Sequence, residues 1–147
     1  MEPLEFVYPE EEVLEHPSDV GLKVSGEDFR SALTRLIEAF YSLQLKRASS
    51  FSGEKKSLII CGPDKEAVVV RVLSELLYLL QGEGVIFRGR VKEVKEEGGE
   101  VCAELEGEFF KCSFSPGDFI EDIKAVTYHK IEVKERDGCR IRVFFDI

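Results

Sequence analysis

Positive charge is scarce in this sequence, which has 20 Lys and Arg against 29 Asp and Glu and a net charge of −9. Proteins that hold nucleic acid by themselves usually present a basic face, because neutralising phosphates drives that binding. The two short basic clusters, Lys46-Arg47 and Lys55-Lys56, are interpreted as solvated loop charges. We therefore expect any contact with RNA to be indirect, through a partner that holds it.

Long apolar runs are also missing, and none approaches the roughly 20 residues that a membrane-spanning helix needs. The first residues are acidic and lack the positive start and apolar stretch of a secretory signal. We expect a cytoplasmic protein with no membrane segment.

The four cysteines form no C-x-x-C pair and show no zinc-ligand spacing. Cys61, Cys102, Cys112 and Cys139 each lie in or beside a strand-like segment. We expect four buried, reduced thiols. This expectation counts against a redox-switched chaperone, which would need paired reactive cysteines.

Apolar residues recur at three- and four-residue steps in two stretches, which predicts two helices with core-facing stripes. The first stripe runs from Phe29 to Phe40 and the second from Val69 to Leu80. Residues 25–28 and Asp64 can cap the two starts, and Gly82 can end the second helix.

The remaining segments predict strands at 13–14, at 22–24, at 57–61 and over most of the chain from Val85 onward. A phase slip before Val94 predicts a bulge, Gly98-Gly99 a turn, and Ser115 to Asp118 a loop. The order of elements predicts an α+β fold in one domain, residues 1–147, with two helices packed on a largely antiparallel sheet.

The last hairpin has a preferred register. A three-residue loop over 136–138, with Gly138 left-handed, pairs Ile131 with Val143 and keeps charged residues away from the core face. If residues 127–134 form one continuous strand, His129 shares its inward face and Tyr128 lies opposite Asp146. Lys124 then lies four residues farther along, about 13 Å from that point at about 3.3 Å per residue.

Few residues offer chemistry. Asp19 lies in an irregular segment with His16 and Ser18 and could simply belong to a turn. Asp146 is next to the final residue, Ile147, so its carboxylate and the terminal one form a compact pair of hard oxygen donors, unless the terminus frays. Spacing alone does not bring Asp19 to Asp146. No phosphate loop or nucleophile elbow appears, so we expect no catalytic centre and no enzyme activity.

Four segments together resemble the archease family. His16–Gly21 is similar to the family pattern H-T-A-D-[IV]-G, and Leu73–Leu80 is similar to L-S-E-L-L-Y-L-F. Ile123–His129 is similar to V-K-A-[VI]-T-Y-H, and Phe144–Ile147 is similar to the terminal pattern [FI]-D-I. The chain departs from the pattern at Pro17 and Ser18, which replace Thr-Ala, and it lacks a histidine often found before Lys124. Residues 1–9 look like an N-terminal extension.

The resemblance implies an accessory protein for a GTP- and manganese-dependent tRNA-splicing RNA ligase, whose guanylylation and turnover it promotes. It also implies a divalent-metal site formed by Asp19, Asp146 and Ile147, with calcium expected first and manganese or magnesium as alternatives. Lys124 corresponds to a further functional residue of the family, which we place at the partner interface.

Two other functions are weighed against this one. A general chaperone, or a modulating factor for enzymes that process nucleic acids, would need a broad exposed apolar surface. A small metal-dependent hydrolase would need further ligands or a base, which the sequence does not offer.

Overall fold

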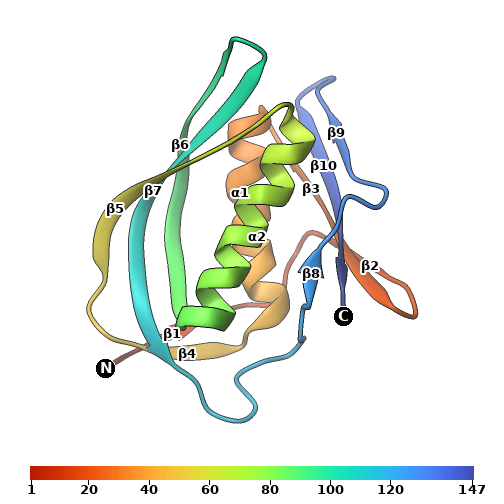
Figure 1. Ribbon diagram of the computed structural model, residues 1–147. Coiled ribbons are helices and arrows are strands. Elements are labelled where there is room, and N and C mark those ends of the chain that lie inside the picture. Colours follow the sequence, from red (N-terminus) through yellow and green to blue (C-terminus); the bar gives the residue numbers. More distant parts are fainter.

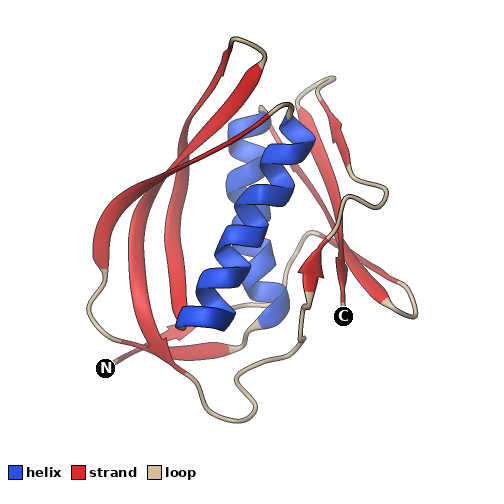
Figure 2. Ribbon diagram, viewed as in Figure 1, coloured by secondary structure: helices blue, strands red, loops and turns tan.

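Two helices lie between two antiparallel sheets in the computed structural model, which describes all residues 1–147 (Figure 1). The strands are β1 (Glu2–Glu5), β2 (Glu12–Glu15), β3 (Asp19–Gly26), β4 (Arg47–Ser50), β5 (Glu54–Gly62), β6 (Val85–Glu97), β7 (Glu100–Ser113), β8 (Ala125–Val126), β9 (Glu132–Lys134) and β10 (Cys139–Asp146). The helices are α1 (Phe29–Gln44) and α2 (Lys65–Glu83). The α+β class is therefore confirmed, although the strands form two sheets and not one (Figure 2).

The helices begin where their caps predict. The Asp28 carboxylate accepts a hydrogen bond from the Ser31 backbone N–H at 2.8 Å, and Asp64 accepts one from Ala67 at 2.7 Å. Both predicted apolar stripes are buried. The predicted end of α2 at Gly82 is wrong, because Gly84 is the residue with the left-handed backbone, at φ 67°, and its N–H bonds to the Leu80 carbonyl at 3.1 Å.

The first sheet has the strand order β1-β4-β7-β5, and β6 pairs with β7 along the edge opposite β5. The predicted bulge lies between Val91 and Glu93, and Gly98 and Gly99 form the hairpin tip with positive φ angles. Strands β1 and β4 were not predicted. Arg47 begins β4, and Lys55-Lys56 lie within β5, so these basic clusters are exposed but are not loops.

The cysteines differ from expectation. Cys61 of β5 lies opposite Cys102 of β7, and the two form a disulfide. Cys112 and Cys139 are free and buried, as expected. The paired thiols were missed because only the strand register brings together residues 41 positions apart. The chain therefore has the paired cysteines whose expected absence counted against a redox-switched protein.

The second sheet has the order β2-β3-β10-β8, with β9 also on β10. The predicted hairpin register is confirmed, because Ile141 lies opposite Val133 and Arg142 opposite Glu132, as a pairing of Ile131 with Val143 requires. Gly138 has a φ of 99°. The predicted continuous strand over 127–134 is wrong, because a turn separates β8 from β9.

That turn changes the register. Lys130 has a positive φ of 54°, and the Ile131 N–H bonds back to the Tyr128 carbonyl at 3.2 Å. Because the turn takes up residues that were expected to pair with β10, Ala125, and not Tyr128, lies opposite Asp146. His129 lies in this turn and is exposed, so the prediction that it faces inward is also wrong.

One apolar core of 34 buried residues joins the layers. Helix α1 contacts β3, β10 and β6, while α2 contacts strands of both sheets. The sheets therefore bury their inner faces against the same helix pair and leave their outer faces open (Figure 1). No helix has the length and apolar character needed to cross a membrane.

Candidate metal centre

Asp19 and Asp146 lie directly opposite each other at one end of the two central strands of the second sheet, and this end is called the acidic edge below. Asp19 begins β3 and Asp146 ends β10, and the antiparallel register pairs them. Their neighbours Val20 and Phe145 point into the core, so both carboxylates project from the outer face. Side chains in such a pair have Cβ atoms about 4.5–5.5 Å apart. The structure thus joins two acids that sequence spacing alone left apart.

The last residue closes the same corner. The Ile147 backbone N–H points to the Ser18 carbonyl at 3.5 Å, which holds the end of the chain beside the segment leading into β3. Ile147 is half-buried against the core. The end of β10 therefore lies at the same edge as the two aspartates.

An unpaired atom marks this corner. Asp19 Oδ1 is buried and has no hydrogen-bond partner. A buried acceptor without a donor costs about 1–3 kcal/mol, and a second carboxylate nearby adds repulsion. A hard divalent cation would satisfy both the free oxygen and the crowded charge. The donor set therefore fits calcium, manganese or magnesium.

The segment before Asp19 is supported by an aromatic ring. The His16 N–H donates to the Asp19 carbonyl at 3.1 Å, which sets the turn. The His16 ring packs edge-on against Phe144 at 5.4 Å between centroids, and His129 contacts the same ring at 6.3 Å. A Cβ on Gly21 would lie 2.8 Å from Phe144, so glycine is required beneath that ring.

Lys124 lies beside Asp146, which overturns the predicted separation of about 13 Å. Its backbone N–H donates to the Asp146 carbonyl at 2.8 Å, one step before β8. The side chain is exposed. The two residues are close because a turn, and not a continuous strand, separates β8 from β9. Lys124 and the two aspartates therefore occupy the same edge of the sheet.

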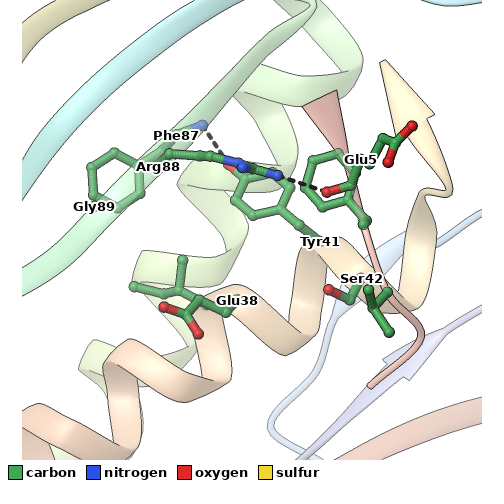
Figure 3. A pocket seen from close by; sticks show the side chains of 10 residues that line it. Glu5, Glu38, Tyr41, Ser42, Phe87, Arg88 and Gly89 are labelled. Carbon is green, nitrogen blue, oxygen red and sulfur yellow. Dashed lines mark hydrogen bonds between the residues drawn. The ribbon is translucent and has the colours of Figure 1, made fainter. Parts of the chain in front are cut away.

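A cavity of about 280 Å³ lies elsewhere, between the N-terminal segment, α1 and β6 (Figure 3). Arg88 lies over the Phe6 ring at 4.8 Å and donates to the Glu5 carbonyl at 2.9 Å. The Tyr41 hydroxyl accepts a hydrogen bond from the Phe87 N–H at 3.1 Å, and burial raises the pKa of this phenol. The sequence did not predict this cavity, because the N-terminal segment that covers it carries no motif.

Comparison with known proteins agrees with this architecture. A solution structure of protein 1598 from Methanobacterium thermoautotrophicum is similar, with a TM-score of 0.72 at 20% identity over 92% of this chain and 97% of that one. A crystal structure of an archease from Thermotoga maritima, described as a possible chaperone, has a TM-score of 0.54 at 20% identity over 95% and 99%. Fold and site together define a small α+β protein with two helices between two sheets and an acidic edge.

Sequence similarity identifies the family. The profile of the Archease protein family matches residues 12–147. The archease of Methanosarcina barkeri is 31% identical over 140 residues, covering 92% of this chain and 94% of that protein. The archease of Pyrococcus abyssi is 28% identical over 123 residues, covering 82% and 85%. This chain belongs to the Archease family.

Proposed function

We propose that this chain is a metal-binding accessory protein that activates a GTP- and manganese-dependent tRNA-splicing RNA ligase in the cytoplasm. It promotes guanylylation and turnover of the ligase, has no catalytic centre of its own, and meets RNA only through the ligase. The observation that carries the proposal is the unpaired Asp19 oxygen opposite Asp146, beside the terminal carboxylate. Membership of the Archease family supports it.

Asp19, Asp146 and the Ile147 carboxylate would hold the ion. Calcium is expected first, with manganese or magnesium as alternatives, because all the donors are hard oxygens. Three protein ligands leave coordination positions for water, so the ion exchanges readily and its shell can be completed by a partner. The ion supplies positive charge at an edge that otherwise carries three negative groups.

Lys124 contacts the ligase. Its ammonium is free to do so, because the side chain is exposed and only its backbone is engaged with Asp146. An acidic edge with one lysine suits the basic, phosphate-binding cleft expected of an RNA ligase, since complementary charges orient the two proteins.

Guanylylation of the ligase tests the function. The purified chain is added to the ligase with labelled GTP and manganese, and label on the ligase is followed over time. We expect faster labelling of the ligase and none on this chain. Lys124→Ala should reduce the activation while leaving calcium affinity within about threefold, because an exposed lysine contributes little to the ion's shell. Label on this chain with no effect on the ligase would contradict the proposal.

Calorimetry tests the metal site separately. Asp19→Ala, Asp146→Ala and an added residue after Ile147 should each weaken calcium or manganese binding by at least about tenfold, since each removes or displaces a ligand. Glu12→Gln is the matched control, because Glu12 lies on the same sheet but pairs with Lys23 at 4.0 Å. Unchanged affinity in all three variants would place the ion elsewhere.

A general chaperone activity is the second candidate. The Thermotoga maritima relative is described as a possible chaperone. In this chain the loop before Lys124 exposes Phe119 at 42% and Ile120 at 41%, and Tyr128 follows at 56%. A chaperone would suppress aggregation of an unrelated unfolded protein and bind an apolar dye. An accessory factor specific for the ligase would do neither.

A further inference from the structure

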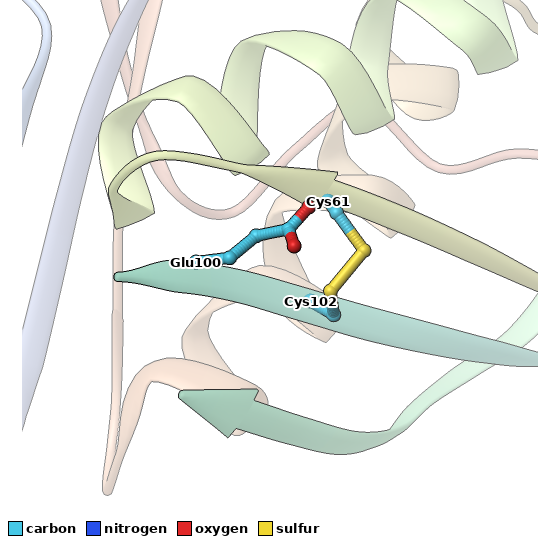
Figure 4. A group of neighbouring side chains, drawn as sticks. All are labelled: Cys61, Glu100 and Cys102. Carbon is cyan, nitrogen blue, oxygen red and sulfur yellow. A yellow bond between two sulfur atoms is a disulfide. The ribbon is translucent and has the colours of Figure 1, made fainter. Parts of the chain in front are cut away.

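The first sheet carries a second group of possible metal ligands, on its outer face and near the tip of the β6–β7 hairpin. Cys61 of β5 lies opposite Cys102 of β7, and Glu100 precedes Cys102 by two residues on the same face of the strand. The two sulfurs and a Glu100 carboxylate oxygen all lie within 4.8 Å of one another. In Figure 4 the Glu100 side chain extends toward the disulfide.

The surroundings favour a cation. The register places Lys95 opposite Cys102, Glu97 opposite Glu100 and Glu93 opposite Glu104, all on this outer face. Acidic neighbours therefore outnumber the two cations, Lys95 and Arg71, of which Arg71 donates a hydrogen bond to the Cys61 carbonyl at 2.7 Å. Both cysteines are half-buried and Glu100 is exposed, so an ion can reach the group from solvent.

We propose that in the reduced protein the Cys61 and Cys102 thiolates and the Glu100 carboxylate bind a zinc ion. Two sulfurs and one carboxylate oxygen are a donor set that zinc accepts, with tetrahedral geometry and Zn–S distances of about 2.3 Å. Reduction frees the sulfurs to separate by rotation about χ1 while the paired strands hold both side chains on one face. A water molecule fills the fourth position.

The disulfide is the oxidised, metal-free form of the same site. Binding of the ion displaces the two thiol protons. A low-molecular-weight disulfide is the oxidant: one cysteine thiolate attacks it and expels a small thiolate, forming a mixed disulfide. The second cysteine then attacks the mixed disulfide and expels another small thiolate. Two electrons pass to the oxidant, the Cys61–Cys102 bond forms, and the zinc ion leaves.

This site is independent of the acidic edge and of the function proposed for it. Two of its three protein donors are soft sulfurs, while the donors on the second sheet are all hard oxygens. A spectroscopic signal that arises only from sulfur ligation therefore reports on this group alone, even when ions also bind at Asp19 and Asp146.

Cobalt provides that signal. The full chain is reduced, freed of metal and titrated with Co²⁺, and the near-ultraviolet sulfur-to-cobalt charge-transfer band is followed; zinc is then added to displace the cobalt. We expect a saturable band that zinc abolishes, and no band in the oxidised protein. Cys61→Ser and Cys102→Ser should each weaken cobalt binding by at least about 100-fold, because a direct ligand matters more than its supporting residues.

Glu100→Gln keeps both cysteines and tests the geometry without disturbing the disulfide. We expect zinc affinity of the reduced protein to fall about tenfold or more, while the disulfide forms as in the parent. Glu104→Gln removes the same charge from the same face, and Cys112→Ala removes a buried free thiol; neither should change the band. Absence of the band in the reduced parent, or Glu100→Gln binding zinc as tightly as Glu104→Gln, would overturn the proposed ligand set.

Discussion

The two sheets of this protein expose different ligand atoms on their outer faces. The second sheet gathers carboxylates, where β3 and β10 bring Asp19 to Asp146. The first gathers sulfur, where β5 and β7 bring Cys61 to Cys102. Both groups arise from antiparallel pairs of residues that are distant in sequence. The comparison teaches that strand register can build a candidate site where no local motif exists.

The largest expected effect on stability comes from removing the Cys61–Cys102 disulfide of the first sheet. Cys61→Ser with Cys102→Ser removes a link between residues 41 positions apart. The chain-entropy relation predicts that the free energy of unfolding of the oxidised protein falls by roughly 4 kcal/mol. Denaturant unfolding of the parent and the double variant, both without reductant, measures this difference.

The same unfolding measurement on the reduced protein, with and without zinc, tests the proposed zinc site. Reduced, metal-free parent should unfold like the double variant, and added zinc should stabilise the reduced parent alone. Equal stabilisation of the double variant by zinc would show that the ion acts at another site. A parent insensitive to reductant would show that the disulfide contributes nothing to stability.

The next effect concerns the connection between the sheets. Lys65, at the start of α2, pairs with Glu135 beside β9 and with Glu96 of β6 at 3.3 Å, and only 18% of its side chain is exposed. Burial lowers its pKa, but the hydrogen bonds and charges of Glu135 and Glu96 more than offset this and raise the pKa overall. Lys65→Met should lower the free energy of unfolding by about 1 kcal/mol, as measured with denaturant.

The matched control for Lys65 is Lys55→Met, since Lys55 is an exposed β5 residue outside this cluster. It should change stability by less than about 0.5 kcal/mol. Equal effects of the two substitutions would mean that the cluster does not link the sheets.

Substitution at the Asp19–Asp146 pair should have a smaller effect, and it should raise the free energy of unfolding. Asp146→Asn removes repulsion with Asp19, so the metal-free variant should be more stable than the parent by roughly 0.5 kcal/mol. Saturating calcium should reverse the order, because only the parent keeps the full ligand set. Thermal unfolding with chelator and with calcium measures both states. A variant less stable than the parent in chelator would argue that the two acids do not repel.

The smallest expected effect is a pH dependence of the free energy of unfolding, which comes from one buried thiol in each sheet. Burial raises the pKa of Cys112 in β7 and of Cys139 in β10. A raised folded-state pKa means that the stability is fully present below the unfolded thiol pKa, about 8.5, and is lost as pH rises through the folded value. The free energy of unfolding should therefore decline above about pH 8.5, and less steeply in Cys112→Ala and Cys139→Ala. Identical slopes in parent and variants would exclude these thiols as the cause.

Much of the fold was predictable because its signals are local. The caps Asp28 and Asp64, the apolar helix stripes, the Gly98-Gly99 tip and the register of the last hairpin all depend on residues close in sequence. The end of α2 was placed two residues too early because Gly82 and Gly84 are both glycines, and only the backbone conformation distinguishes the residue that stops the helix.

The candidate site was predicted only in part. Asp19, Asp146 and Ile147 were proposed from resemblance, and their spacing says nothing of their proximity. The position of Lys124 was wrong because the turn at Lys130 interrupts what looked like a continuous alternation. Alternation cannot show where a strand leaves its sheet, since turn residues can keep an apolar pattern by chance.

The sequence by itself determined the two helices, their capping residues, the tight turns and the α+β class, because helix periodicity, capping and turn chemistry act between neighbours. Only the tertiary structure decided that the strands divide into two sheets, that Asp19 meets Asp146 and that Cys61 meets Cys102. These pairings depend on which register buries the most apolar surface against the shared helices, and that sum runs over the whole chain.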